Sequence, residues 1–205
     1  MQQGCPQVSR HVPALPVPRA ACANIAAAFR GARRTMKVLL TGVNGQVGWE
    51  LARRVPAGVT LDATDRTVLD LASDYVAARV IARRPDVIIN SAAYTAVDAA
   101  ESDEAAAHAL NADGAGMIAR VAAQKGIPII HISTDYVYDG TKTCPYVETD
   151  PTNPVNAYGR SKLAGGAFRL LGGTVNQYRA LIDGGYQFAQ RLDGVVDGIR
   201  NGACD

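Results

Sequence analysis

The stretch Met36-Lys-Val-Leu-Leu-Thr-Gly42-Val-Asn-Gly45-Gln-Val-Gly48 decides the fold class of this chain. A short apolar run, typical of a β-strand, ends directly before the first glycine, and a helical pattern opens near the last one. Glycines at such a turn let the backbone approach a pyrophosphate, which the N–H groups and the dipole of the following helix can bind. Glycine clusters also mark ordinary turns, but the place between strand and helix favours a dinucleotide site. We expect this site to use Gly42, Asn44, Gly45, Gln46, Val47 and Gly48.

Strands and helices alternate downstream of this turn. The expected strands are residues 37–41, 59–64, 86–90 and 129–133, and the expected helices are residues 47–54, 73–84, 101–110 and 111–124. Because helices of this length link successive strands, the crossovers should be right-handed and the sheet parallel. The fold class is therefore α/β, with a doubly wound parallel sheet and helices on both faces. Beyond Leu171 the pattern fades, and the best candidates are a strand at 175–182 and a helix at 186–199.

Composition divides the chain into three parts. Residues 1–35 contain several prolines and an alanine-rich segment, and no acidic residue precedes Glu50. A targeting peptide, a disordered tail and sequence upstream of the true start compete as interpretations, and weak apolarity with a single serine argues against the first. We expect 1–35 to be disordered or outside the fold, 36–171 to form a dinucleotide-binding domain with the catalytic helix, and 172–205 to be a divergent segment.

Charge and cysteine usage exclude several classes of protein. The 205 residues carry a formal charge of +2 without a run of Lys and Arg, so nucleic acid is not an expected partner. No segment approaches the roughly 20 apolar residues that cross a membrane. The four cysteines lack C-x-x-C spacing and the three histidines are isolated, which predicts neither a disulfide framework nor a zinc site. A reducing, cytoplasmic location fits best.

The end of the second expected strand should recognise the adenosine of a dinucleotide. An acidic residue is needed there to bind the ribose hydroxyls, and Asp65 is favoured over Asp62. Arg66 complicates the choice of cofactor, because an Arg attracts the 2′-phosphate that an Asp repels. We therefore expect both NADH and NADPH to be used. Asp70 and Leu71 either contact the adenine edge or, equally well, belong to a solvated turn that the Asp caps.

The third part of the predicted site is an acid–base pair. Tyr158 and Lys162 are four residues apart and share one face of a helix, where an ammonium lowers the pKa of a phenol. The alternative is a purely structural role, with a half-buried Tyr and a Lys whose charged end is in solvent. Ser133 or Thr134, at the carboxyl end of the fourth strand, can hydrogen-bond a substrate carbonyl. The small, polar segment after the third strand lets the cofactor's ribose pass close to Ala92, Ala93 and Tyr94.

Four motifs, in this order, resemble those of the dTDP-4-dehydrorhamnose reductases, a family of the extended short-chain dehydrogenases. They are MKVLLTGVNGQVGWEL at 36–51, NSAAYTAVDAAE at 90–101, STDYVYDG at 133–140 and NAYGRSKLAG at 156–165. The resemblance covers roughly residues 36 to 166 and implies a Rossmann-type fold. It also implies the last step of dTDP-L-rhamnose synthesis for cell-surface polysaccharide, in which NADPH or NADH reduces the 4-keto group of a dTDP-4-keto-6-deoxy sugar.

Carried over by position, the resemblance makes Thr134, Tyr158 and Lys162 catalytic, with Tyr158 and Lys162 also touching the cofactor. Related sugar-nucleotide 4,6-dehydratases have Thr-Asp-Glu where this chain has Thr134-Asp135-Tyr136. Elimination of water needs an additional acid and base, whereas a reduction needs one proton donor. The missing Glu therefore favours reduction.

Metal, partners and the C-terminal region depend on the resemblance alone. Some relatives bind Mg²⁺ through a Glu that matches Glu50 at a dimer contact, so the resemblance leaves Mg²⁺ and a homodimer open, while the residues themselves predict no metal site. In the family, a further region holds the nucleotide sugar, and we expect most of this substrate-binding half to be absent here. Gly165-Gly166 also stands where Gly-Glu is expected. Two alternatives remain: a non-catalytic NAD(P)-binding regulatory module, and an inactive truncated remnant.

Overall fold

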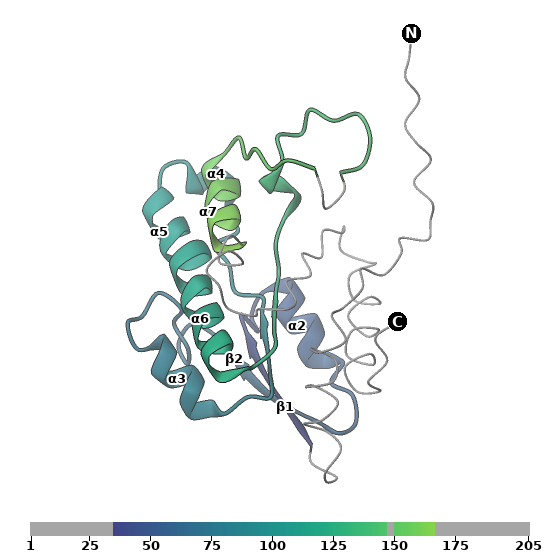
Figure 1. Cartoon of the computed structure of the whole chain (residues 1–205), viewed down its shortest axis with the longest axis vertical. Coiled ribbons are helices and arrows are strands. Elements are labelled where there is room, and N and C mark those ends of the chain that lie inside the picture. The colour runs from purple at the N-terminus through teal and green to yellow at the C-terminus, as the bar shows by residue number, and fades with distance from the viewer. Residues whose placement is uncertain (1–34, 147–149, 167–205) are drawn as a thin grey trace.

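The structure, a computed structural model, describes residues 35–146 and 150–166. The interpretations of the leader, of the strand at 175–182, of the helix at 186–199 and of the segment 172–205 lie outside these residues. A sheet with the strand order β2-β1-β3-β4 lies at the centre of the molecule (Figure 1). All three strand pairs are parallel, which confirms the predicted sheet. The strands are β1 Met36–Thr41, β2 Val59–Thr64, β3 Val87–Asn90 and β4 Ile129–His131.

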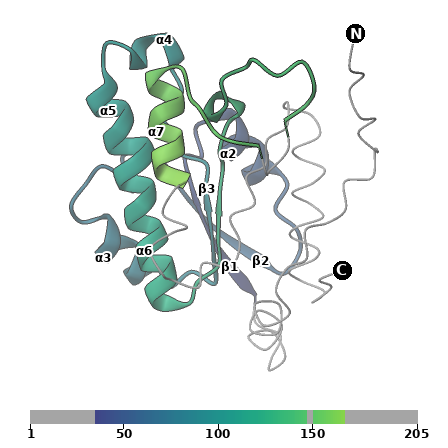
Figure 2. The ribbon, with the colours of Figure 1, turned by 45° about the horizontal axis from the view of Figure 1, so that its top comes forward.

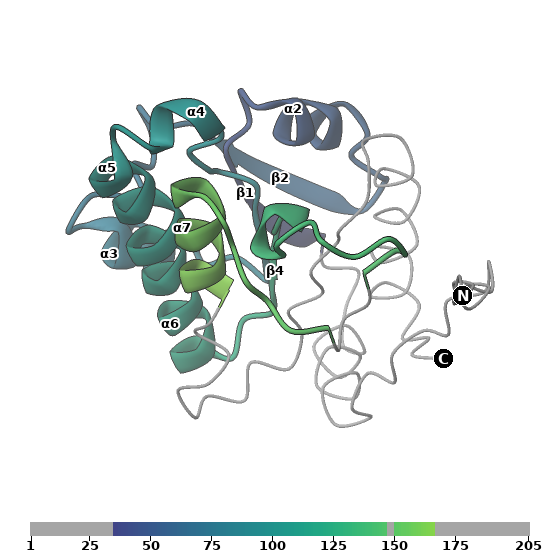
Figure 3. The same ribbon diagram turned by 90° about the horizontal axis from the view of Figure 1, so that it is seen from above.

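Helices cover both faces of the sheet (Figures 2 and 3). On one face, α2 Gln46–Arg53 packs Val47 and Leu51 against the side chains of β1 and β3 that point to that face, among them Leu40. On the opposite face, α3 Val76–Arg83 and α6 Ala115–Lys125 pack against side chains such as Leu39 and Ile88. Both faces are apolar because strands buried on two sides have no polar face. The doubly wound architecture is thus confirmed.

The helical segment between β3 and β4 differs from the prediction. A short α4 Val97–Ala100 comes first, and α5 Glu104–His108, the π-helical turn η1 Ala109–Gly114 and α6 then follow without a break. The predicted boundary between residues 110 and 111 is therefore wrong. A Cβ on Gly114 would lie 2.6 Å from the carbonyl oxygen of Leu71. The helix backbone therefore lies against the loop after β2 at the end of the π-helical turn.

Two further boundaries move by a few residues. α3 begins at Val76 and not at Ser73, because the Ser73 hydroxyl accepts a bond from the N–H of Tyr75 and supports a turn before the helix. β4 ends at His131 and not at residue 133, and the Ile132 carbonyl instead accepts a bond from the Lys162 ammonium. The sequence pattern predicts where a strand lies, but the partner that takes each carbonyl decides where it ends.

The predicted helix that carries Tyr158 and Lys162 is α7 Ala157–Gly166, which packs against α5 and η1. A short 3₁₀ turn, η2 Asp135–Val137, follows β4 and also contacts α7. Figure 2 shows α7 lying beside α5 and α6, near the end of the sheet at which the strands finish. Tyr158 and Lys162 are therefore carried to the carboxyl edge of the sheet, where open α/β sheets bind ligands.

Three findings bear on the expectations from composition. Within residues 35–146 and 150–166, no helix is long and apolar enough to cross a membrane. In the same residues, no three His, Cys, Asp or Glu side chains come together as a metal site. Cys144 is disulfide-bonded, which the scattered cysteines did not predict, because pairing depends on Cα distances in the fold and not on spacing along the chain.

Candidate active site

Each glycine of the turn between β1 and α2 meets a different geometric demand. Gly42 has a φ of +76°, and a Cβ there would lie 2.6 Å from the backbone nitrogen of Ala92. A Cβ on Gly48 would lie 2.1 Å from the carbonyl oxygen of Gly42, so α2 can start this close to β1 only with glycine. At Gly45, by contrast, the nearest atom to a Cβ is the same oxygen at 3.4 Å. The space in front of Gly45 is therefore open.

This open space lies at the N-terminus of α2. Gly45 is the N-cap residue, and no side chain from the described part of the chain caps the helix. The first N–H groups of the helix, those of Gln46 and Val47, thus face a place that an anion can occupy. The predicted turn therefore fits the pyrophosphate of a dinucleotide.

Trp49 stands on the outer side of α2. It is the only tryptophan in the 205 residues, and 55% of its surface is exposed. The guanidinium carbon of Arg53 lies 4.4 Å from the centroid of its ring, which is a cation–π contact. Glu50, the residue that resembles a metal ligand of some relatives, instead pairs with Arg53 at 3.2 Å and with Arg54 at 2.7 Å.

Asp65 follows β2 and is fixed by hydrogen bonds from its own loop. Its Oδ1 accepts bonds from the Thr67 hydroxyl at 2.6 Å, the Thr67 N–H at 2.9 Å and the Val68 N–H at 3.1 Å. Its Oδ2 accepts a bond from the Asn44 amide at 3.2 Å, which joins the glycine turn to the end of β2. The hydroxyl of Thr67 is the main reason why the pKa of Asp65 is lowered. A charged carboxylate, held in one orientation beside the turn, suits the ribose role that the sequence predicts.

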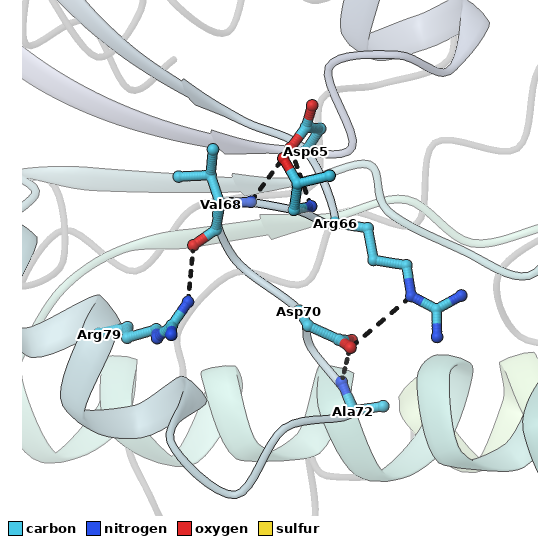
Figure 4. Close-up of polar contacts among 7 residues, drawn as sticks. Asp65, Arg66, Val68, Asp70, Ala72 and Arg79 are labelled. Atoms are coloured by element: carbon cyan, nitrogen blue, oxygen red, sulfur yellow. Dashed lines mark hydrogen bonds and ion pairs between the residues drawn. The ribbon is translucent and has the colours of Figure 1, made fainter.

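The remaining residues of the adenosine prediction are Arg66, Asp70 and Leu71. Figure 4 shows Arg66 beside Asp70, and Asp70 beside Ala72. The Arg66 side chain is 85% exposed, and its Nε lies 3.6 Å from Asp70 Oδ2. Asp70 Oδ1 accepts a bond from the Ala72 N–H at 3.0 Å, which is the turn-capping alternative of the prediction. Leu71 is 3% exposed and belongs to the core beside α3 and α6. Because the core takes the Leu71 side chain, a contact of Leu71 with adenine would be made by its backbone.

The segment after β3 is held by a residue that the sequence analysis missed. Asn111, in the π-helical turn η1, accepts a bond from the Tyr94 N–H at 2.8 Å and donates to the Tyr94 carbonyl at 3.0 Å. Its amide also donates to the hydroxyl of Ser161 on α7 at 2.9 Å. Asn111 thus joins the predicted cofactor segment to the catalytic helix. The sequence contains one signal for this role: Asn111 is a polar residue on the face of an alanine-rich helix that is expected to be buried.

Tyr158 is 8% exposed and lies under η2. The side chain of Thr134 acts on the pKa of its hydroxyl, and its ring meets that of Tyr136 edge-on at a centroid distance of 5.6 Å. The Thr134 hydroxyl donates to Asp135 Oδ1 at 3.1 Å. Thr134 is also the N-cap of η2, and its hydroxyl oxygen accepts a bond from the Tyr136 N–H at 3.3 Å. The structure therefore brings together the predicted proton donor and the predicted carbonyl-orienting hydroxyl.

The charge state of Tyr158 corrects a prediction. Burial raises the pKa of Tyr158, and the charge of Asp135 adds to this effect, while the bond with Thr134 opposes it. The predicted lowering of this pKa by Lys162 is not found. The Lys162 ammonium donates to the Ile132 carbonyl at 2.7 Å. Burial also lowers the pKa of Lys162 to about 8. At neutral pH the site thus holds a neutral phenol and an ammonium.

The start of α7 depends on two further residues without a predicted role. Glu101 Oε1 accepts a bond from the Ala157 N–H at 2.7 Å, and Asn156 Oδ1 accepts one from the Gly159 N–H at 2.6 Å. A Cβ on Gly159 would lie 2.2 Å from the carbonyl oxygen of Tyr136. These contacts fix the first turn of the helix, which carries Tyr158, against η2 and α4.

Comparison with known proteins places this geometry in a family. Residues 36–170 match the model of the family described as the RmlD substrate binding domain. The chain belongs to this family. Among curated proteins, the dTDP-4-dehydrorhamnose reductase of Burkholderia thailandensis is 53% identical over 131 residues, which are 63% of this chain and 44% of that protein. The reductase of Escherichia coli K12 is 46% identical over 135 residues, which are 63% of this chain and 45% of that protein.

Solved structures give the same result. The dTDP-4-dehydrorhamnose reductase of Clostridium acetobutylicum is 40% identical, with a TM-score of 0.62, over 65% of this chain and 48% of that one. The reductase of Bacillus anthracis, solved in complex with NADP, is 36% identical, with a TM-score of 0.63 and the same two coverages. This RmlD-family chain thus spans about half the length of the relatives it matches. All predicted site residues lie within the matched range, as do Glu101, Asn111 and Asn156.

Proposed function

We propose that this chain provides the cofactor-binding and proton-donating half of a reductase. The reductase would convert dTDP-4-dehydro-L-rhamnose to dTDP-L-rhamnose with NADPH or NADH. The observation that supports this most directly is the buried Tyr158 beside Thr134, at the edge of the sheet to which the glycine turn also opens. The names of the relatives give the substrate class, and the Bacillus anthracis relative binds NADP.

The chemistry needs one hydride and one proton. NADPH or NADH, when bound, supplies the hydride to C4 of the keto sugar. Tyr158 gives its phenolic proton to the carbonyl oxygen, so that the ketone becomes an alcohol. The raised pKa keeps Tyr158 protonated at neutral pH, which is the state that reduction requires. Thr134 orients the carbonyl oxygen beside the phenol, and the phenolate that remains takes up a proton from solvent before the next turnover.

Recognition of the cofactor is shared between two ends of the site. The turn from Gly42 to Gly48 receives the pyrophosphate, and Asp65 binds the adenosine ribose. Arg66 is exposed, and within the described residues it forms an ion pair with Asp70 alone. Its side chain can therefore turn toward a 2′-phosphate without breaking a buried contact. Lys162 holds the nicotinamide ribose near Ala92 and Tyr94.

The proposal is tested by following the absorbance of reduced nicotinamide with dTDP-4-dehydro-L-rhamnose as substrate. Tyr158→Phe should lower turnover by about 10²–10⁴-fold and leave the affinity for NADPH nearly unchanged, because only the proton donor is lost. Tyr136→Phe is the matched control, since it removes a hydroxyl from the neighbouring ring. Full turnover by Tyr158→Phe would contradict the mechanism. Binding of NADPH without any turnover by the unmodified chain would instead favour the regulatory module or the inactive truncated remnant.

A further inference from the structure

Two buried polar side chains, Asn111 and Ser161, meet between η1 and α7. Each of the two residues is 1% exposed. The Asn111 amide donates to the Ser161 hydroxyl at 2.9 Å, and the Ser161 hydroxyl donates to the Tyr158 carbonyl at 2.7 Å. Buried polar groups stabilise a fold only when they are hydrogen-bonded. The other partners of this pair therefore show which parts of the molecule it joins.

The Asn111 amide has only one orientation that fits its partners. Its Oδ1 accepts a bond from the Tyr94 N–H at 2.8 Å, and its nitrogen donates to the Tyr94 carbonyl at 3.0 Å as well as to Ser161. An amide nitrogen has two N–H groups, and both are used here. Since that nitrogen can only donate, Ser161 accepts from Asn111 and gives its own proton to Tyr158. An unbroken series of bonds thus joins the backbone of Tyr94 to the backbone of Tyr158.

The packing of α7 against η1 reinforces this series of bonds. Gly165 lies four residues after Ser161 and shares its helix face, and a Cβ on Gly165 would lie 2.0 Å from the Asn111 carbonyl oxygen. Tyr94 also packs against the apolar cluster that contains Tyr158. The two backbones are therefore in close contact at this face, which leaves α7 little freedom to shift along η1.

We propose that Ser161 is a positioning residue for the nicotinamide end of the proposed cofactor site. Tyr94 belongs to one wall of that end, and α7 carries Tyr158 and Lys162 on the other wall. Through Asn111, Ser161 fixes the spacing between the two walls. This inference rests on the proposed function, since it assigns to Ser161 an effect on cofactor binding through the residues that it holds.

The first test separates the two ends of the cofactor. Ser161→Ala removes the acceptor of the Asn111 amide and the donor to the Tyr158 carbonyl. It should weaken NADPH binding about 5-fold, the usual contribution of one neutral hydrogen bond. Binding of 2′,5′-ADP, which has no nicotinamide ribose, should not change. Fluorescence titration measures the affinity for NADPH, and competition measures that for 2′,5′-ADP.

The second test needs no cofactor and follows hydrogen exchange of single amides. The Tyr94 N–H reports the link, and the Ile88 N–H, bonded to the Pro128 carbonyl at 2.9 Å in the sheet, reports opening of the core. Ser161→Ala should speed exchange at Tyr94 about 5-fold more than at Ile88. Val80→Ala is the control, because Val80 is fully buried on α3 and touches neither Asn111 nor Ser161 in the described contacts. This variant should affect Ile88 at least as much as Tyr94.

Two results would overturn the inference. Equal weakening of NADPH and 2′,5′-ADP by Ser161→Ala would show a general effect on the fold, as would equal acceleration of exchange at Tyr94 and Ile88. Failure of the proposed function looks different. The unmodified chain would then bind no NADPH, which would also remove the cofactor role of Ser161, while exchange at Tyr94 would still depend on Ser161.

Discussion

Lys162 lies on a buried face of α7 and is 2% exposed. Its ammonium has a backbone carbonyl as partner and its pKa falls to about 8 because of burial. In the unfolded chain a lysine titrates near its ordinary value of about 10.4. Below pH 8 both states are protonated, and the folded state then bears the full cost of the buried charge. Between these two values the unfolded chain binds more protons, so stability rises with pH.

We therefore expect Lys162→Met to change the pH dependence of stability. Urea unfolding of the unmodified chain should show a free energy of unfolding that rises from pH 8 toward pH 10, and this rise should be smaller in Lys162→Met. The difference should be on the order of 2 kcal/mol. Identical slopes in the two proteins would show that the ammonium is well solvated in the folded state.

Arg66 gives a second prediction at the scale of one residue. Its side chain is 85% exposed and the nearest carboxylate in the described residues is 3.6 Å away, so its removal should not disturb the fold. Arg66→Ala should weaken NADPH more than NADH, because only NADPH carries the 2′-phosphate that the guanidinium can bind. The test is to measure the dissociation constants of NADPH and NADH in both proteins. An equal loss of affinity for both cofactors would mean that Arg66 does not contact the phosphate. Arg79→Ala serves as control, since Arg79 bonds to the Val68 carbonyl in the same loop.

At the scale of elements, α7 depends on its N-terminal contacts more than on its own sequence. Three of its ten residues are glycines, namely Gly159 and, at the end of the helix, Gly165 and Gly166. Glycine is a poor helix former. The carboxylate of Glu101 and the amide of Asn156 supply partners for two of the four N–H groups that any helix leaves unpaired. Both contacts lie next to Tyr158.

Glu101→Ala should therefore destabilise the protein by about 1–2 kcal/mol, the usual cost of a lost cap. Glu104→Ala is the matched control. Its carboxylate reaches the same helix, but it pairs with the exposed side chain of Arg160 at 3.1 Å, and such surface pairs contribute about 0–1 kcal/mol. Urea unfolding measures both. A larger effect from Glu104→Ala than from Glu101→Ala would show that the cap is unimportant.

The sequence predicted elements better than it predicted contacts between them. β2 was predicted at its observed bounds, and β1, β3 and β4 within two residues. The buried strands β1, β3 and β4 are continuous apolar runs between turn signals, whereas the edge strand β2 mixes polar and apolar residues. The π-helical turn at Ala109–Gly114 was not predicted, since it arises where Gly114 meets the loop after β2, and that contact is not local. The roles of Asn111 and Glu101 were missed for the same reason, because their partners are far away along the chain.

At the scale of the whole molecule, the proposed cofactor site connects the glycine turn on one side of the sheet with α7 on the other. A ligand that binds only the folded state stabilises it by mass action, by about 2.7 kcal/mol at a hundred times its dissociation constant. Saturating NADPH should therefore raise the melting temperature by roughly 5–10 °C for a domain of this size. Differential scanning fluorimetry measures the shift.

Gly45→Val should abolish this shift without a large loss of stability. Its Cβ meets only the Gly42 oxygen at 3.4 Å, so the fold has room for the side chain while the pyrophosphate does not. Gly48→Ala is the contrasting variant, because its Cβ would lie 2.1 Å from that oxygen and should lower the melting temperature of the ligand-free protein. A full shift in Gly45→Val would exclude the turn as the pyrophosphate site. The turn could be predicted from sequence because its geometry is local, whereas the charge states of Tyr158 and Lys162 depend on burial that only the fold determines.

Trp49 stands on the helix whose first turn faces the proposed pyrophosphate position, and it is the one indole among the 205 residues. Indole emits light in the wavelength range that a reduced nicotinamide absorbs, so the chain carries its own energy-transfer donor beside its cofactor site. Quenching of this emission by NADPH would report occupancy without any label. The oxidised cofactor does not absorb in that range, and it therefore provides the optical reference for the same titration.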